Sequence, residues 1–339
     1  MRSLPLFVLS VFVFPGVLSA QSAGPLDAIN HNRPILDAHN CYPYEGKWAD
    51  RVDRALKTGY PVGIEQDLAW GIDKATGQGR PVVSHQKQTN GSEPTLREYF
   101  FEHVRPLVEK ALRENNRSAW PLIVVHFDVK DNRPELLHAV WDLLGEYEPW
   151  ITTAQFNADP HVLMPYDVKP LLVMTEDSDA QEEVFFKPLK SGDKLRLFGS
   201  AHTAAMPAGG TREERTRLAA TTAPEKLLTE KPTNYRRWWN NSWYEVEEGG
   251  QTKAGDWTPA DDARLRALVD HAHKLGFWIR FYTLDGFAQA DGLGWDRGYN
   301  FGSREAVLQR WNAAIAAGVN LIATDQYEDL ASVLNTKIK

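Results

Sequence analysis

The sequence is short of several features that would assign it quickly to a class. It contains a single cysteine, Cys41, so no intramolecular disulfide can form and its stability must come from the packed core. It has no internal repeat and no low-complexity tract, which argues against a solenoid or a disordered chain. Lys and Arg (38) are outnumbered by Asp and Glu (45), and the net charge of -7 disfavours a nucleic acid as partner.

Long hydrophobic runs are also lacking beyond the N-terminus. There, Arg2 precedes an apolar run over 4–18 that ends in small residues, the layout of a secretory signal peptide cleaved near Ala20. The run is short for a membrane span, and no later segment approaches one. We therefore expect residues 1–20 to be removed. The rest is expected to be a secreted or periplasmic protein without a transmembrane segment, which touches a membrane surface at most transiently.

Short apolar runs alternate with helical patterns from residue 34 onward, which predicts a parallel sheet. The strand-like runs cover 34–39, 62–68, 121–130, 170–176, 195–201, 235–243, 277–283 and 320–325. Helical periodicity is clearest over 48–59, 96–115, 134–147, 259–276 and 303–318. Eight such units predict a single-domain α/β protein, a (β/α)8 TIM barrel over residues 30–339. The stretch 203–258 has poor periodicity and is expected to form long loops around strands five and six.

Two carboxylates share one face of the second predicted strand. "GIEQDLAW" (63–70) carries Glu65 and Asp67 two positions apart, or roughly 7 Å along a strand, where like charges repel. "HFDVK" (126–130) adds Asp128 on the third strand, and barrel chemistry gathers at such C-terminal strand ends. One divalent cation would turn the repulsion into coordination, and oxygen ligands suit Mg2+ or Ca2+.

Two other interpretations of these polar and aromatic residues stay open at this point. The three carboxylates can instead form a buried ion-pair cluster with Lys130 and Arg280. The Trp-rich run near Trp239 either packs in the core or forms an aromatic wall of a substrate pocket.

The motifs "DAHN" (37–40), "GIEQDLAW", "GRPVVSH" (79–85), "HFDVK" and "GVNLIATDQYEDL" (318–330) follow one another in a familiar order. Together they resemble the signature of glycerophosphodiester phosphodiesterases and related phospholipase-C-like phosphodiesterases. The variant "HNCY" with "RALKTGYPVGIEQDL" is similar to the branch that includes the fungal altered-inheritance-of-mitochondria proteins. The resemblance spans about 34–331 and is weak over 140–270.

The resemblance implies metal-dependent cleavage of a phosphodiester, such as a glycerophosphodiester or a phospholipid-derived substrate, by hydrolysis or intramolecular transfer. His39 and His85 would be the acid–base pair. Many relatives carry Arg directly after the first His, where this chain has Asn40. The metal ligands implied are Glu65, Asp67 and Asp128, and the residues that contact the phosphate or substrate are Lys130, Asn40, Arg280 and Trp239.

Other functional classes fit the residues less well. A glycoside hydrolase would use carboxylates and Trp platforms without a metal, but here the carboxylates crowd one strand beside His and Lys. A metal-dependent amidohydrolase needs His-x-His on its first strand, where this chain has Asp37 and His39. A non-catalytic ligand-binding barrel would lack the histidines or the acidic pair, and both are present.

Overall fold

The structure is a computed structural model that describes residues 33–43, 49–204, 210–247, 255–288, 290 and 300–337. The expected signal peptide, residues 1–20, lies outside the described residues, so its removal stays a prediction.

Eight parallel strands form a closed barrel, as predicted. They are β1 (Ile35–Ala38), β2 (Val62–Ile72), β4 (Ile123–Val129), β7 (Leu171–Thr175), β9 (Phe198–Ser200), β10 (Arg236–Ser242), β11 (Trp278–Tyr282) and β12 (Leu321–Thr324). Their hydrogen-bonded order is β1-β12-β11-β10-β9-β7-β4-β2, and pairing of β1 with β2 closes the ring. All eight of the strand-like runs in the sequence contribute to it. A further strand, β3 (Gly79–Val83), extends β2 as an antiparallel hairpin.

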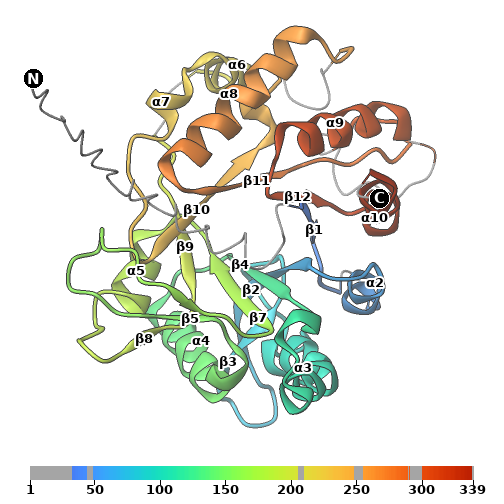
Figure 1. The fold of residues 1–339 in the computed structure, drawn as a ribbon. Coiled ribbons are helices and arrows are strands. Elements are labelled where there is room, and N and C mark those ends of the chain that lie inside the picture. Colours follow the sequence, from blue (N-terminus) through green and yellow to red (C-terminus); the bar gives the residue numbers. More distant parts are fainter. Residues whose placement is uncertain are drawn as a thin grey trace, which may run out of the picture.

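Helices follow most of the barrel strands and surround them (Figure 1). They are α2 (Arg51–Lys57), α3 (Glu102–Glu114), α4 (Pro134–Glu146), α5 (Asp179–Phe185), α6 (Arg212–Thr221), α7 (Pro224–Leu227), α8 (Pro259–Leu275), α9 (Arg304–Ala317) and α10 (Tyr327–Lys337). The stretch 203–258 thus contains α6 and α7 besides its loops. A small sheet of β5 (Thr153–Gln155), β6 (Tyr166–Asp167) and β8 (Lys194–Leu195) packs outside the barrel.

Local signals in the sequence explain where the helices begin and end. Thr258 and Asp261 form a capping box at the start of α8, and Pro259 occupies its first turn. Gly276 and Gly318 end α8 and α9 with φ angles of 95° and 84°, a left-handed conformation that glycine adopts without a steric penalty.

The strand register determines which side chains share the barrel interior. Glu65 and Asp67 of β2 lie directly beside His126 and Asp128 of β4. Paired residues of neighbouring parallel strands point to the same side of a sheet, so these four side chains all face inward. The alternate positions, such as Ile64 and Val125, are fully buried in the apolar layer between the strands and the helices.

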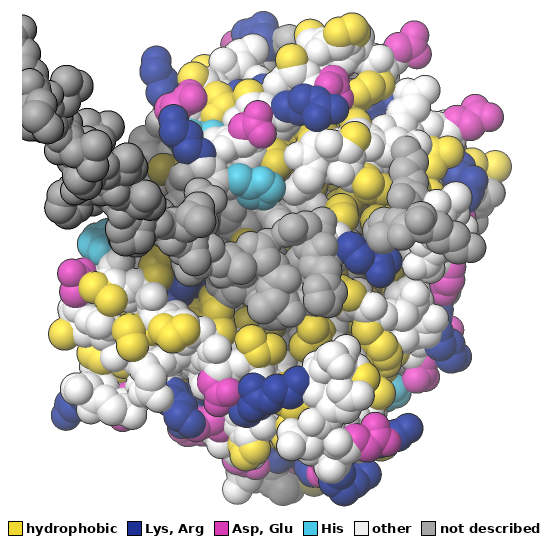
Figure 2. Space-filling model, in the orientation of Figure 1, with side chains coloured by type: hydrophobic (Ala, Val, Ile, Leu, Met, Phe, Trp, Pro, Cys, Tyr) yellow, Lys and Arg dark blue, Asp and Glu magenta, His cyan; other side chains and the backbone are white. Residues whose placement is uncertain are grey.

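The outer surface carries charges of both signs. Figure 2 shows Lys and Arg interspersed with Asp and Glu around one face of the molecule, together with scattered apolar side chains. Among the described residues, no helix is long and apolar enough to cross a membrane.

We predict that Gly63→Ala destabilises the barrel by about 1–3 kcal/mol, the usual cost of overpacking. A Cβ at Gly63 would lie 2.5 Å from Asp37 Oδ1 of the neighbouring strand, inside van der Waals contact. Denaturant unfolding measures the change. Gly145→Ala in α4 is the control: its Cβ would meet Arg196 at an ordinary 3.5 Å, so helix propensity should leave stability unchanged or raise it by up to about 1 kcal/mol. Equal effects of the two substitutions would contradict the prediction.

Candidate functional site

A polar pocket of about 710 Å³ opens at the C-terminal ends of the barrel strands. Its lining comes from the ends of β1, β2, β4, β7, β10 and β11, and from the loop after β3. It includes most of the residues singled out in the sequence, namely His39, Asn40, Glu65, His85, Asp128, Lys130 and Arg280. Asp67 is fully buried and contacts two of these lining residues, His85 and Lys130.

The three carboxylates expected to bind a metal converge on one point. One oxygen each from Glu65, Asp67 and Asp128 lies within 4.8 Å of the others. Oxygen clusters of this kind suit hard divalent cations, so these residues can hold one such ion. Two further acidic clusters with His lie nearby: Asp37 with Glu65 and His126, and His39 with Asp285 and Asp325.

Arg280 pairs with two of these acidic residues, Asp37 and Glu65. Its Nε donates to Asp37 Oδ2 at 2.5 Å, one Nη donates to Glu65 Oε2, and the other donates to Asn240 Oδ1 at 3.0 Å. Although burial disfavours an ionised Glu65, the cations around it, His39 first and Arg280 next, lower its pKa well below the usual value. The guanidinium lines the pocket, where buried Asp37 and Glu65 and half-buried Asn240 hold it in place.

Asp67 is shared between two partners through a single oxygen. His85 Nδ1 lies 2.7 Å and Lys130 Nζ 3.1 Å from Oδ2. The other oxygen, Oδ1, is buried and has no hydrogen-bond partner among the described residues. A buried carboxylate oxygen without a partner is costly. A cation held between Glu65, Asp67 and Asp128 would provide the missing contact, so the residues fit a metal on this observation.

The surroundings of Asp128 shift its pKa. Burial, and next the charge of Asp67, raise its pKa to about 6. Lys130 Nζ lies 2.6 Å from Asp128 Oδ2 and partly offsets this repulsion. The structure therefore contains both the carboxylate cluster and the ion pairs to Lys130 and Arg280 that the sequence allowed as alternatives. The unpartnered oxygen of Asp67 favours the metal interpretation.

Asp325, which lies 286 positions away in the sequence, orients the imidazole ring of His39. His39 Nδ1 lies 2.8 Å from Asp325 Oδ1, while Nε2 lies on the side of Glu65, 3.8 Å from its Oε1. Burial opposes protonation of His39, but Glu65 and Asp325 together raise its pKa to about 9. Asp325 therefore serves as a hydrogen-bond partner of His39.

Asn40 belongs to the same arrangement. Its backbone has a left-handed φ of 50°, and its side-chain amide donates to Asp325 Oδ1 at 3.1 Å. The Tyr42 hydroxyl donates to the side-chain oxygen Oδ1 of Asn40 at 2.8 Å. Asn40 thus helps to hold the partner of His39, and its contact with a phosphate stays a prediction.

The prediction that Trp239 lines the substrate pocket is wrong. Its side chain is fully buried, and its indole N–H donates to Thr203 Oγ1 at 2.8 Å. Successive side chains of a strand point to opposite faces. Because Asn240 points into the barrel toward Arg280, Trp239 must point outward into the layer beneath the helices.

Sequence reasoning missed two acidic residues of the site. Glu176 directly follows β7, lines the pocket, and accepts a hydrogen bond from His126 Nε2 at 2.6 Å. Its place at the end of a predicted strand was the available signal. Asp285 accepts hydrogen bonds from the Thr324 hydroxyl and the Asp325 amide, each at 2.6 Å. It lies beyond the strand-like run over 277–283, so no periodicity marked it.

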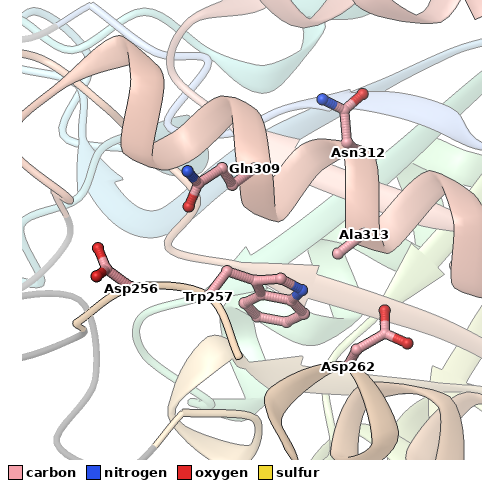
Figure 3. A pocket seen from close by; sticks show the side chains of 6 residues that line it. All are labelled: Asp256, Trp257, Asp262, Gln309, Asn312 and Ala313. Carbon is pink, nitrogen blue, oxygen red and sulfur yellow. The ribbon is translucent and has the colours of Figure 1, made fainter. Parts of the chain in front are cut away.

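A second hollow, of about 450 Å³, lies between the start of α8 and the middle of α9, away from the barrel mouth. Figure 3 shows Trp257 beneath α9, with Asp256 and Asp262 on either side of its ring. Asp262 is paired with Arg266 at 2.7 Å. None of the site residues expected from the sequence lines this hollow.

Comparisons with known proteins leave the family open. No protein-family model and no curated protein matches the sequence. Among solved structures, a triple mutant of Plasmodium falciparum HPPK-DHPS with SDX-DHP is 12% identical, with a TM-score of 0.43 over 90% of this chain and 47% of that chain. The wild-type protein with STZ-DHP gives 13% identity and 0.43 over 91% and 47%. The chain thus spans about half the length of these structures.

Mycobacterium tuberculosis Rv1207 is 15% identical, with a TM-score of 0.35 over 92% of this chain and 95% of that chain. Likenesses this distant carry no argument about the reaction. The barrel is established by its own strand order, and the site must be interpreted from its own residues.

The buried carboxyl of Asp285 predicts a pH-dependent stability. Burial, and next the charge of Asp325, raise its pKa from 3.8 to about 7. Because the folded state then binds a proton more tightly than the unfolded chain, the free energy of unfolding falls as pH rises from 3.8 toward about 7. Asp285→Asn removes this pH-dependent loss of stability, and its side-chain oxygen can still accept hydrogen bonds from the Thr324 hydroxyl and the Asp325 backbone N–H. Its melting temperature should therefore rise relative to wild type between about pH 4 and pH 8.

Thermal unfolding across that pH range measures the effect. Asp142→Asn, on the exposed face of α4, is the control and should run parallel to wild type. A difference between Asp285→Asn and wild type that stays constant with pH would contradict the prediction.

Proposed function

We propose that this protein is a metal-dependent phosphodiesterase of the glycerophosphodiester phosphodiesterase and phospholipase-C-like type. Its substrate would be a glycerophosphodiester or a phospholipid-derived phosphodiester, cleaved at the barrel mouth. The proposal includes the signal-peptide expectation, by which the protein acts outside the cytoplasm, in the periplasm or after secretion.

One observation carries the proposal: two histidines flank the carboxylate cluster, and each has its Nδ1 held by a carboxylate. His39 Nδ1 lies 2.8 Å from Asp325, and His85 Nδ1 lies 2.7 Å from Asp67. A carboxylate at Nδ1 favours the tautomer with its proton there, which leaves Nε2 for proton transfer with a ligand. A pair of such nitrogens beside one cluster supports acid–base catalysis with two proton transfers.

Cleavage of a phosphodiester needs a base for the nucleophile, an acid for the leaving alkoxide, and positive charge near the non-bridging oxygens. His39 and His85 would serve as the acid–base pair. Lys130, at the end of β4, is the cation that can reach a phosphoryl oxygen above Asp128. One divalent cation, Mg2+ or Ca2+, held by Glu65, Asp67 and Asp128, would supply Lewis-acid stabilisation of the same charge.

Arg280 has a different role in this proposal from the phosphate contact expected from the sequence. Its guanidinium donates hydrogen bonds to Asp37, Glu65 and Asn240, so its main effect is to keep Glu65 ionised and to fix the position of its carboxylate. A buried Arg between two carboxylates is well suited to this task because it stays charged at any relevant pH.

Metal binding can be tested without an assay of activity. We expect isothermal titration calorimetry of EDTA-stripped protein to show one site for Mg2+ or Ca2+. Asp67→Asn should weaken binding at least tenfold, since it removes a charge from a fully buried ligand. Asp53→Asn, on the exposed face of α2 beside His103, is the control and should bind like wild type. No heat of binding for wild type would favour the ion-pair interpretation.

Activity is tested with a soluble model phosphodiester and with glycerophosphodiesters. Wild-type turnover should vanish on chelation and return with the divalent cation. His39→Ala and His85→Ala should each lower kcat by about 100-fold or more, the usual contribution of one acid–base group. His273→Ala, on the exposed C-terminal turn of α8, should keep wild-type turnover. Activity on aryl glycosides in its place would indicate a glycoside hydrolase.

A further inference from the structure

Five buried or half-buried side chains form a ring of polar contacts in the floor of the pocket. They come from β2, β4, the end of β7, β10 and β11, and are Glu65, His126, Glu176, Asn240 and Arg280. His126 Nε2 lies 2.6 Å from Glu176 Oε1, and its Nδ1 lies 3.4 Å from Glu65 Oε2. Asn240 Nδ2 donates to Glu176 at 3.3 Å, and Arg280 joins Asn240 to Glu65. Glu65, the proposed metal ligand, is thus connected to Glu176 by two routes: one through His126, and one through Arg280 and Asn240.

The members of the ring differ in their access to the pocket. Glu65, His126 and Arg280 are 3%, 1% and 1% exposed, so their polar atoms are used inside the barrel. The side chain of Glu176 is 25% exposed and lines the pocket, as does Asn240. A ligand in the pocket can therefore contact the ring through the carboxylate of Glu176.

Glu176 also retains unused acceptor capacity. Oε1 accepts from His126 and lies 3.4 Å from the Asn240 amide, and Oε2 lies 3.3 Å from the same amide. A carboxylate has about four lone-pair sites, so at least one remains for a donor in the pocket. A donor there would gain a charge-assisted hydrogen bond, which is roughly twice as strong as a neutral one.

We infer that Glu176 is a specificity-determining residue that accepts a hydrogen bond from a hydroxyl on the alcohol portion of the substrate. This inference rests on the proposed phosphodiesterase function and assigns a substrate class to the same site. A carboxylate at this position selects an alcohol with a hydroxyl beyond its ester oxygen, and repels an alcohol with a second anionic group.

The neighbouring side chains match a hydroxyl better than a bare hydrocarbon. Asn132, Ser178 and Gln181 line the same wall of the pocket and offer both donors and acceptors. Gln181 is held in place by Thr175 at 2.6 Å and by Asn132 at 2.8 Å, so this wall is preorganised. An acyl chain against this wall would exclude water from polar side chains that line the pocket, at a cost in free energy.

The test compares two soluble diesters that differ by one hydroxyl, 3-hydroxypropyl 4-nitrophenyl phosphate and propyl 4-nitrophenyl phosphate. Wild-type protein with its cation should prefer the hydroxylated diester in kcat/KM by roughly tenfold, the effect of one hydrogen bond to a charged group. Glu176→Gln keeps the size of the side chain and removes its charge, and should reduce the preference to less than about threefold. Because the preference is a ratio, it does not depend on the fraction of folded or metal-loaded protein.

Glu182→Gln is the matched control. Glu182 lies in the first turn of α5, pairs with Arg236 at 2.7 Å, and lies outside the pocket lining, so the preference should stay at the wild-type value. Glu176→Asp, which keeps the charge, should retain more of the preference than Glu176→Gln.

Three results are distinguishable. Loss of the preference in Glu176→Gln alone supports the inference. Hydrolysis of both diesters with no preference in wild type, or a preference that survives in Glu176→Gln, overturns the role of Glu176 and leaves the phosphodiesterase proposal standing. No hydrolysis of either diester by metal-loaded wild type overturns the proposed function, and the inference falls with it.

Discussion

The site depends on one buried cation, the guanidinium of Arg280. It stands in the barrel interior between Asp37 and Glu65, both almost fully buried, and pairs with each of them. Two carboxylates in a low-dielectric interior cannot both stay ionised without such a partner. Removing one member of a buried ion pair usually costs about 3–5 kcal/mol, because the remaining charge is left uncompensated. Arg280 therefore allows an acidic cluster to exist inside this barrel.

The acidic residues divide into a lower layer and an upper layer. Below, Arg280 and His126 contact Asp37, Glu65 and Glu176, so two basic side chains offset most of the charge of three carboxylates. Above, Lys130 contacts both Asp67 and Asp128, and His85 contacts Asp67. The pKa of Asp128 is raised there by burial and next by the charge of Asp67. In the upper layer a divalent cation would meet carboxylate oxygens with one nearby lysine, whereas in the lower layer the guanidinium of Arg280 already pairs with Asp37 and Glu65.

Much of this arrangement could be predicted from the sequence. The alternation of strand-like and helical runs identified all eight barrel strands, and the residues that end them include His39, Glu65 and Asp128. Period-two alternation placed each pair of polar residues correctly on one face. The same rule places Trp239 and Asn240 on opposite faces of their strand, so only one of them can face the pocket. The uncertainty there was which face of the strand pointed inward, and the sequence of one strand does not say.

The remaining features depend on contacts between residues far apart in the chain. The sequence by itself determined where strands and helices form, because propensity and periodicity act over a few residues. Only the tertiary structure decided that Asp325 would hold His39, that Arg280 would reach Glu65, and that Glu176 would close a ring through His126 and Asn240. These pairings arise because barrel closure brings β1 beside both β2 and β12, and register then selects which side chains meet.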